Sequence, residues 1–410
     1  MQKIVIVGAG FGGLAAALAL EKKLGKDKNI SLTLVDQRAY HIFTSNLYEV
    51  VSAEEELVSV DQIKKSITLP FEEILQGKNI QFILGEFLEI DPLQKIISLS
   101  TRKLQYDYAI LALGSVSDFY GIEGAEKYGL PLKSLADALR IKNQIEFAVQ
   151  MHRTDIRKKT LRVVIAGGGY TGVETAGELV RALDIIAWKN NYPREKIEIE
   201  IVEGGNQLIA GFDPRLSKDA FSRLNDLGVR VRLLSPIVKV ENGFLETLTK
   251  ERIAFDVLVW SMGVKSAKLN IKGNMNLDNK GRVETNGYLQ TKNFSNIFVI
   301  GDESCILDQQ GEPVASTAQD AIHQGRFLAE VLPKVLKNQT PPAYSCLKHG
   351  FIVCIGGKWA ILSIGKYYFT GFFAFIVSRL AHLEYYISLL GVWRGFKYAF
   401  FETKYFTRND

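Results

Sequence analysis

Cysteine is scarce in this sequence, whose 410 residues contain only Cys305, Cys346 and Cys354. Their spacing fits neither C-x-x-C nor C-x4-C, so we expect no disulfide framework, no zinc site and no other bound metal. An odd, scattered set of cysteines is typical of a reducing compartment.

Long apolar segments of two kinds are also lacking. The chain enters a strand pattern at once, MQKIVIVG, without the charged region, apolar region and cleavage site of a secretory signal. We therefore expect its site to face the cytosol or an equivalent compartment. In the tail, the longest uncharged run, residues 367–378, has 12 residues, fewer than the roughly 20 that span a bilayer.

Net charge is nearly absent from the body of the chain. The 50 Lys and Arg exceed the 45 Asp and Glu only because of the tail from Cys346 onward. There the basic residues Lys348, Lys358, Lys366, Arg379, Arg394, Lys397, Lys404 and Arg408 outnumber the acids Glu384, Glu402 and Asp410. A basic, aromatic-rich tail favours an anionic surface, and because no nucleic-acid-binding module accompanies it, we expect a membrane and no nucleic acid.

Glycine, in contrast, is concentrated in two similar stretches. GAGFGGLAAALAL begins at Gly8, and GGGYTGVETAGEL begins at Gly167. Each contains G-x-G-x-x-G, follows an apolar β-branched run, and leads into an Ala/Leu-rich helical pattern. That context predicts a strand, a tight turn and a helix whose N-terminus faces a pyrophosphate.

Each of these units ends in an acid after a second strand pattern. SLTLVD ends at Asp36, and IEIEIVE ends at Glu203. A carboxylate at this place accepts hydrogen bonds from an adenosine ribose. A single G-x-G-x-x-G also occurs in ordinary tight turns, but two complete units indicate that the chain binds two dinucleotides, a resident flavin and a diffusing nicotinamide.

Three further strand patterns suggest how the domains are ordered. YDYAILALGS, 106–115, contains Gly114, and FDVLVWSMGV, 255–264, contains Gly263; we interpret both as crossings between domains. NIFVIGDES, 296–304, brings Asp302 to a strand end. We predict an α/β fold with two Rossmann-like domains. Residues 1–115 and 283–330 form the flavin-binding domain, 116–282 the nicotinamide-binding domain with linking segments, and 331–410 a C-terminal amphipathic helical membrane-anchoring region, with NQTPPAY, 338–344, as a linker.

With these motifs in place, the chain resembles the type II NADH dehydrogenases, the single-subunit, non-proton-pumping NADH:quinone oxidoreductases. GAGFGG with Asp36, ALGS, GGGYTGVETAGEL, Glu203, WSMGV, VIGD and ASTAQDAIHQGRFLA occur in the family's order and at similar spacing, over nearly the whole length. The Gln-containing stretch is the most specific, since the others are shared across the disulfide-reductase-like superfamily.

The resemblance implies FAD in the first domain and NADH in the second. For FAD it points to Gly8, Gly10, Phe11, Gly12, Gly13, Asp36, Gln37, Arg38, Thr44, Gly114, Gly301, Asp302, Ala318 and Gln319. For NADH it points to Gly167, Gly169, Tyr170, Thr171, Gly172, Glu203 and Gly263. An acid at Glu203 repels a 2′-phosphate, so NADH is expected to be preferred over NADPH.

The segment HIFTSNLYEV, 41–50, occupies the place where disulfide reductases carry their redox cysteine pair. It contains no cysteine, so electrons cannot leave the flavin through a dithiol there. The family usually has Pro-Leu where this chain has Ser45-Asn46, a departure that bears on the shape of the flavin-proximal loop.

STAQDAIHQGRFLAEVL is predicted to form a helix that opens near Thr317, with its positive end toward the flavin. Gln319 and His323 are four residues apart and share a face, with Gln324 beside them. In the family the equivalent stretch lines the quinone pocket, typically with two glutamines where this chain has His323-Gln324. A lone helical histidine is also often a satisfied or exposed residue; one that lines the pocket can give a hydrogen bond or proton to a quinone oxygen.

Glu174 lies two residues past Gly172, on what we expect to be the first turn of its helix. An acid there can simply complement the helix N-terminus. The resemblance suggests instead a residue near the nicotinamide and the quinone pocket, with a part in proton supply.

Residues 367–401 are strongly apolar, and Phe373, Ile376, Leu380, Leu383, Ile387 and Leu390 recur at spacings of three and four, which makes one helical stripe. Trp393, Arg379, Arg394 and Lys397 flank or interrupt it. The pattern favours a helix that lies in the membrane interface, and a helix pair packed on the body or in a dimer contact is the alternative.

These observations together predict a peripheral, monotopic membrane flavoprotein on the cytoplasmic face. It would oxidise NADH through FAD and reduce a menaquinone or ubiquinone, with Glu174, Gln319, His323 and Gln324 as catalytic candidates and a homodimer as a family-level expectation. The enzyme alternatives are a sulfide:quinone oxidoreductase, which needs cysteines near the flavin, and a soluble NADH-dependent ferredoxin or rubredoxin reductase, against which the apolar tail argues. The non-enzyme alternative is a binding protein that uses NADH to switch an interaction.

Overall fold

The computed structural model describes residues 1–52, 65, 67–154, 160–307, 311, 313–314, 316–346 and 350–406. Of the charged tail residues, Lys348, Arg408 and Asp410 lie outside these ranges, as does the side chain of Lys404. The chain divides into two compact units. Met1–His41, Leu69–Val116 and Val264–His349 form the first, and Ile42–Thr68, Ser117–Gly263 and Gly350–Asp410 form the second.

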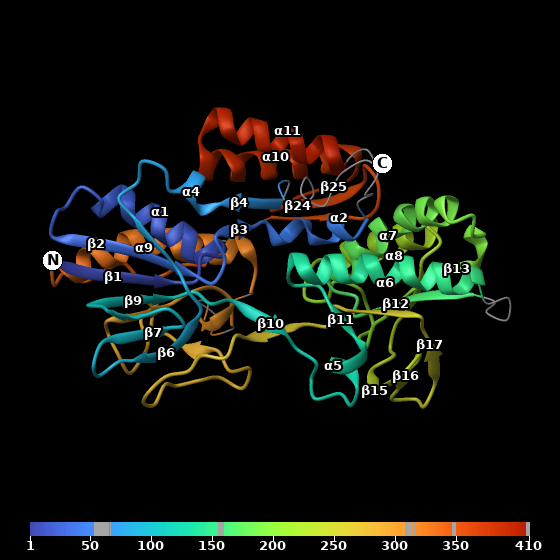
Figure 1. The fold of residues 1–410 in the computed structure, drawn as a ribbon, viewed down its shortest axis with the longest axis horizontal. Coiled ribbons are helices and arrows are strands. Elements are labelled where there is room, and N and C mark those ends of the chain that lie inside the picture. Colours follow the sequence, from blue (N-terminus) through green and yellow to red (C-terminus); the bar gives the residue numbers. More distant parts are fainter. Residues whose placement is uncertain are drawn as a thin grey trace. The chain divides into compact units, whose positions relative to one another are not determined.

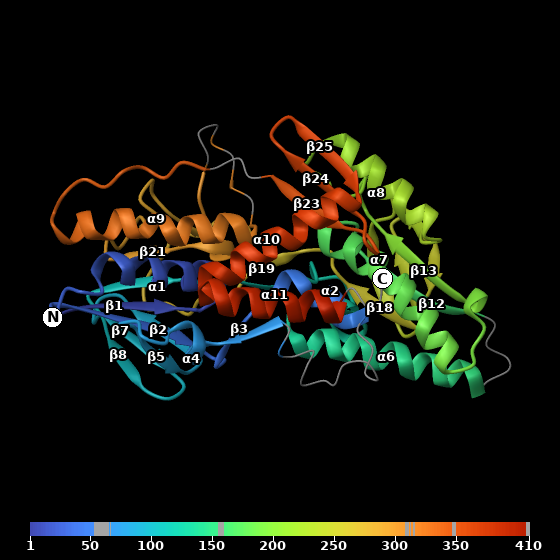
Figure 2. The same ribbon diagram turned by 90° about the horizontal axis from the view of Figure 1, so that it is seen from above.

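The first unit is built on a parallel sheet in the order β21-β9-β1-β2-β5, of which Figure 1 labels β9, β1 and β2 and Figure 2 labels β21 and β5. Its strands are β21 (Ile297–Val299), β9 (Tyr108–Leu111), β1 (Gln2–Val7), β2 (Ile30–Asp36) and β5 (Gln81–Leu84). The apolar β-branched residues of these strands are buried on both faces, as a parallel sheet requires.

Helices and a second sheet cover the two faces of this unit. On one face α1 (Phe11–Leu24) and α9 (Ala318–Leu336) pack side by side (Figure 2). The other face packs on an antiparallel sheet of β6 (Phe87–Asp91), β7 (Ile96–Leu99) and β8 (Lys103–Gln105). The remaining elements are α4 (Phe71–Ile74), β20 (Val283–Glu284), η3 (Gly301–Glu303) and β22 (Ser304–Cys305).

The second unit repeats this plan with a parallel sheet in the order β11-β18-β12-β13-β14. Its strands are β11 (Leu130–Pro131), β18 (Val257–Trp260), β12 (Leu161–Ala166), β13 (Ile197–Val202) and β14 (Arg230–Arg232). Around it lie η1 (Thr44–Asn46), α2 (Leu47–Ser52), α5 (Ala125–Tyr128), α6 (Leu135–Thr154), α7 (Tyr170–Lys189), η2 (Arg194–Lys196) and α8 (Pro214–Asp226), with an antiparallel sheet of β15 (Ile237–Glu241), β16 (Phe244–Thr247) and β17 (Arg252–Ala254).

Two-stranded ribbons lie where the chain passes between the units. One pairs β3 (Tyr40–Ile42) with β4 (Thr68–Pro70), and the other pairs β10 (Ser115–Ser117) with β19 (Val264–Ser266). In both units a glycine-rich turn joins the central strand to the helix that follows it. The prediction of an α/β fold with two Rossmann-like domains is thereby confirmed.

The C-terminal region of the second unit consists of an antiparallel sheet and two helices. The sheet contains β23 (Phe351–Cys354), β24 (Ala360–Ile364) and β25 (Tyr367–Gly371), and α10 (Phe372–Leu390) lies beside α11 (Val392–Phe406) (Figures 1 and 2). Ala374 and Phe375 of α10 pack on the sheet. Of the predicted stripe, Phe373, Ile376 and Leu380 are exposed, and Leu383, Ile387 and Leu390 are half-buried.

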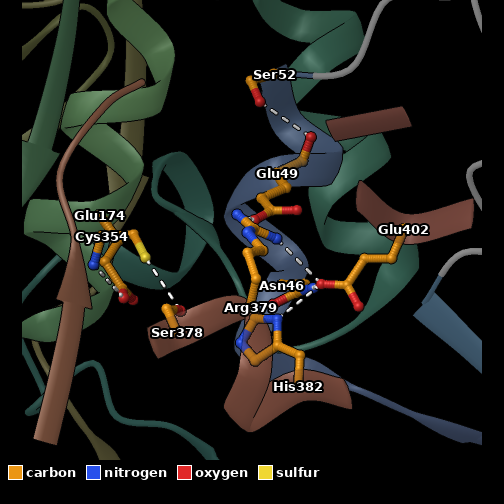
Figure 3. Close-up of polar contacts among 9 residues, drawn as sticks. All are labelled: Asn46, Glu49, Ser52, Glu174, Cys354, Ser378, Arg379, His382 and Glu402. Carbon is orange, nitrogen blue, oxygen red and sulfur yellow. Dashed lines mark hydrogen bonds and ion pairs between the residues drawn. The ribbon is translucent and has the colours of Figure 1, made fainter. Parts of the chain in front are cut away.

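By length and composition alone α10 could cross a membrane, and no second helix among the described residues meets that test. The sequence led us to count Arg379 as an interruption of the apolar run. In the structure that charge is compensated inside the protein: Nη2 of Arg379 lies 2.6 Å from Oε1 of Glu49 in α2, and Nη1 lies 3.1 Å from Oε1 of Glu402 in α11 (Figure 3). Burial disfavours its charged form, but the carboxylates hold the pKa of Arg379 above its usual value.

Asn46 and His382 complete this buried cluster. Nδ2 of Asn46 donates to Oε1 of Glu402 at 2.6 Å, and Nδ1 of His382 lies 2.7 Å from the same oxygen (Figure 3). Asn46 is one of the two residues that depart from the family's Pro-Leu. Its amide therefore has a structural role, which is to hold the segment that precedes α2 against α11.

Because Arg379 is shared by two buried carboxylates, Arg379→Ala should lower the free energy of unfolding by about 3–5 kcal/mol. Urea unfolding of purified protein measures this effect. The control is Arg326→Ala, which removes an exposed arginine of α9 and should change stability by less than about 0.5 kcal/mol. Equal stabilities of the two variants would contradict the account of the cluster.

Candidate functional site

The first glycine-rich turn begins at Gly8, which has a φ of 95°. A Cβ there would collide with the carbonyl oxygen of Ala112, so the position requires glycine. At Gly10, which caps α1, nothing lies within 4 Å of where a Cβ would be. Open space therefore faces the first N–H groups of α1, which no side chain caps, and a pyrophosphate fits that position.

Asp36 fixes the shape of this turn. Its Oδ2 accepts a hydrogen bond from the backbone N–H of Ala9 at 2.8 Å, and its Oδ1 accepts one from Arg38 at 2.9 Å. His41 supports the same turn, because its Nδ1 lies 3.2 Å from the carbonyl oxygen of Ala9. Burial lowers the pKa of His41 to about 4, so the ring is neutral and donates from Nδ1.

The second glycine-rich turn has the same construction. Gly167 has a φ of 100°, and a Cβ on it would lie 2.8 Å from the Cα of Met262. Oε2 of Glu203 accepts from the N–H of Gly168, and Oε1 accepts from Gly205, both at 2.6 Å. Nothing lies within 4 Å of a Cβ placed on Gly169, which precedes α7. Each unit thus presents an open, uncapped helix N-terminus beside a carboxylate, and these residues fit FAD and NADH respectively.

Beside the first turn, the ends of two more strands are joined by side chains. Oγ of Ser115 donates to Oδ2 of Asp302 at 2.5 Å, and the N–H of Leu113 donates to Oε2 of Glu303 at 2.9 Å. Glu303 is fully buried, and its Oε1 has no hydrogen-bond partner among the described residues. Burial raises the pKa of Glu303 to about 8, so its carboxyl group is mostly protonated at neutral pH. Sequence reasoning missed Glu303, whose one signal was its place beside Asp302.

Helix α9 begins at Ala318, and Oγ1 of Thr317 accepts from the N–H of Asp320 at 3.1 Å, close to the predicted helix start. Gln319 is exposed, and His323, which is half-buried, lies one turn further along. Gln324 points inward instead, where its Oε1 accepts from the N–H of Gly301 at 2.6 Å. Its amide therefore holds the turn that carries Asp302.

Tyr344 is a second residue that the sequence did not single out, because it lies in the segment expected to be a linker. Its hydroxyl is 3.1 Å from Nδ1 of His323, and its ring meets the edge of Phe327. Its backbone N–H donates to the carbonyl oxygen of Gly287. Tyr344 thus fixes the orientation of His323.

The remaining predicted residues differ in exposure. Gln37, Thr44 and Thr171 are exposed, Arg38, Phe11, Gly114 and Gly263 are half-exposed, and Gly12, Gly13 and Gly172 are buried. Tyr170 packs edge-on against Phe212. By the division of the chain Thr44 belongs to the second unit, whereas most of the residues predicted to bind FAD belong to the first.

Glu174 corrects one expectation. Helix α7 begins at Tyr170, so Glu174 is its fifth residue and lies beyond the first turn. The first turn itself contains no acidic residue. Its Oε1 is 3.4 Å from the backbone nitrogen of Cys354 (Figure 3). Burial, with help from the charge of Glu49, raises the pKa of Glu174 to about 8. A protonated carboxyl cannot complement a helix dipole.

Comparison with known proteins places these features in context. The pyridine nucleotide-disulphide oxidoreductase family matches residues 2–325. A curated relative from Staphylococcus haemolyticus named type II NADH:quinone oxidoreductase is 25% identical over 402 residues, which cover 97% of this chain and 98% of the relative. A relative of the same name from Staphylococcus aureus is 27% identical over 361 residues, 87% of this chain and 88% of the relative.

Solved structures show the same fold. NDH2 from Plasmodium falciparum in complex with NADH matches with a TM-score of 0.85 at 21% identity, over 99% of both chains. The sulfide:quinone oxidoreductase from Aquifex aeolicus matches with a TM-score of 0.76 at 17% identity, over 95% of this chain and 92% of that one. At such identities the likeness concerns the fold alone.

Glu303 yields a prediction for stability. Its raised pKa means that the folded state binds more protons than the unfolded state between about pH 4.5 and 8, so its presence makes stability fall as pH rises through that window. The free energy of unfolding of the wild type should fall by on the order of 3 kcal/mol between pH 5 and 8 because of Glu303. Glu303→Gln mimics the protonated form and should remove this fall. Urea unfolding at several pH values measures this loss. Glu330→Gln, at an exposed position of α9, is the control, and parallel pH profiles for wild type and Glu303→Gln would contradict the assignment.

Proposed function

The chain belongs to the pyridine nucleotide-disulphide oxidoreductase family, and from that premise we propose that it is an FAD-containing NADH:quinone oxidoreductase that does not pump protons. NADH, one proton and a quinone become NAD⁺ and a quinol, so two electrons and two protons reach the quinone. The quinone is of the menaquinone or ubiquinone type.

The observation that carries the proposal is the doubled nucleotide site. In both units a terminal acid holds a glycine-rich turn open in front of a helix N-terminus. No cysteine precedes Cys305 in the sequence, so segment 41–50 offers no dithiol through which electrons could pass. A quinone as acceptor is supported by the names of the curated relatives that match nearly the whole chain.

Each part of the site has a task that follows from its geometry. A bound FAD would supply the capacity for hydride acceptance and two-electron transfer. The turn from Gly8 to Gly13 holds its pyrophosphate, and the turn from Gly167 to Gly172 holds that of NADH. Glu203 places negative charge where NADPH carries its 2′-phosphate, so NADH is the preferred donor.

Proton supply and quinone binding fall to other residues. Glu174 keeps its proton at neutral pH and is the proposed proton donor. Gln319 and His323 share the face of α9 that we assign to the quinone, and Tyr344 orients the imidazole of His323. Gln324 acts as a positioning residue through Gly301.

Anaerobic stopped-flow absorbance tests the function. The flavin band of the FAD-loaded protein is followed as NADH and then a short-chain quinone are added in sequence. Rapid bleaching by NADH and rapid recovery with quinone are expected. Bleaching without recovery would mean that the electron acceptor is not a quinone, and turnover far slower than one per second with every quinone would favour the NADH-responsive binding protein.

The same experiment on Glu174→Gln tests proton supply. In the wild type, recovery with quinone should slow above about pH 8, because Glu174 then loses the proton that it donates. In the variant, recovery should be slower at pH 7 by on the order of 100-fold and should not change further up to pH 9. Bleaching by NADH should stay unchanged. Identical recovery in both proteins at every pH would leave Glu174 without this role.

The protein also presents an apolar surface to its surroundings. On α11, Trp393, Phe396 and Phe400 are exposed, with Arg394 and Lys397 between them. Arg379 ties α10 to α2 and α11, and Ala374 and Phe375 pack on the sheet of β23, β24 and β25. The apolar side chains on the other side of α10, Phe373, Ile376 and Leu380, stay exposed. We assign this surface, on the cytoplasmic face, to an anionic bilayer from which the quinone is drawn.

A triple variant, Trp393→Ser with Phe396→Ser and Phe400→Ser, tests this surface. It should reduce co-sedimentation with phosphatidylglycerol-containing vesicles by more than about tenfold, since each side chain loses the free energy of entering lipid. The matched control replaces Phe147, Met151 and Trp188, which are exposed on α6 and α7. Point variants are preferable to deletion of the tail, because deletion removes Glu402 from the buried cluster. Vesicle binding equal to that of the control would refute the assignment.

A further inference from the structure

Tyr120 has an unusual conformation for a bulky residue. Its φ is 51°, in the left-handed region that favours glycine, yet its side chain is 57% exposed and so is not held there by a packed core. Its neighbours hold it: its backbone N–H donates to Oδ1 of Asp118 at 2.9 Å. Strained backbone of this kind persists where the surrounding structure fixes it, often at binding sites.

The segment that carries Tyr120 is fastened to the end of β18. The carbonyl oxygen of Asp118 accepts a hydrogen bond from Nε1 of Trp260 at 2.7 Å, and its N–H donates to the carbonyl oxygen of Gly263 at 3.0 Å. The rings of Phe119 and Trp260 stack at 5.5 Å. Tyr120 therefore has a fixed place at the carboxyl edge of this sheet.

The hydroxyl of Tyr120 lies close to Met262 and Gly263, which follow the end of β18. It is 3.4 Å from the carbonyl oxygen of Met262, and a Cβ on Gly263 would collide with it. A Cβ on Gly167, the first glycine of the second turn, would lie 2.8 Å from the Cα of Met262. Only Met262 thus separates the hydroxyl from the proposed NADH turn, and both lie at the same edge of the sheet.

The strand order indicates which half of a bound dinucleotide would reach the hydroxyl of Tyr120. β12 leads into the turn, β13 with Glu203 lies on one side, and β18 with Gly263 lies on the other. A dinucleotide crosses the carboxyl ends of such strands with its pyrophosphate at the glycine-rich turn. If Glu203 holds the adenosine ribose, the nicotinamide ribose passes over β18, beneath Tyr120.

We propose that Tyr120 is an NADH-binding residue whose hydroxyl hydrogen-bonds to the ribose of the nicotinamide half. This inference rests on the proposed function only in its use of NADH. Partial burial, with the charges of Asp118 and Glu203, holds the pKa of Tyr120 above its usual value, so the hydroxyl keeps its proton and can donate. Glycine at 263 leaves room for the hydroxyl at this position.

The test is calorimetric titration of the FAD-loaded protein with NAD⁺, ADP-ribose and ADP. NAD⁺ and ADP-ribose both contain the ribose of the nicotinamide half, whereas ADP contains only the adenosine ribose. Tyr120→Phe removes only the hydroxyl of an exposed side chain. We expect its Kd for NAD⁺ and for ADP-ribose to rise about three- to tenfold, the effect of one hydrogen bond, with the Kd for ADP unchanged.

Tyr128→Phe, in the same linking segment, is the matched control and should leave all three values unchanged. An unaltered Kd for NAD⁺ in Tyr120→Phe would overturn the inference, and so would an equal rise for ADP, because the hydroxyl would then serve the adenosine half. These titrations contain no quinone, so a failure of the quinone half-reaction would leave this result intact.

Discussion

The two nucleotide sites depend on one hydrogen-bonding arrangement, a carboxylate that accepts from the backbone of its own glycine-rich turn. Asp36 binds the N–H of Ala9, and Glu203 binds that of Gly168. Each acid also binds an N–H two residues further on, so both carboxylate oxygens are engaged with the backbone. The turn is therefore set before any nucleotide arrives, and the helix N–H groups behind it stay available. The cost of ordering the turn is met in folding and not in binding.

Local sequence patterns predicted the parts of this site that depend on local chemistry. The two turns, their acids and the start of α9 next to Thr317 follow from spacing and residue type. Side chains whose partners come from distant segments were missed or misjudged. Glu303 gave no periodic signal, Tyr344 lay in an apparent linker, and Gln324 shared a helical region with His323 yet turned inward to Gly301. Tertiary hydrogen bonds decide such orientations, and periodicity carries no information on them.

Desolvation shifts the pKa of several carboxyl groups in this protein. Glu303, which is fully buried, and Glu174, which is half-buried, both have a pKa near 8, because desolvation disfavours their charged forms. Glu49 and Glu402 are also buried, but they share the charge of Arg379. Burial still raises the pKa of Glu49, whereas His382 and Arg379 outweigh burial and lower that of Glu402. The neutral acids are the groups able to exchange protons near physiological pH.

The Asn46–Glu402 and Glu49–Arg379 contacts join residues that are 356 and 330 positions apart in the chain. A ribosome synthesises the first partner of each pair long before the second, so these contacts of the second unit cannot form until Arg379 and Glu402 have been made. The surface of α10 and α11 that we propose to bind lipid belongs to the same segment as Arg379 and Glu402, so the contacts that hold this surface in place also wait for that segment.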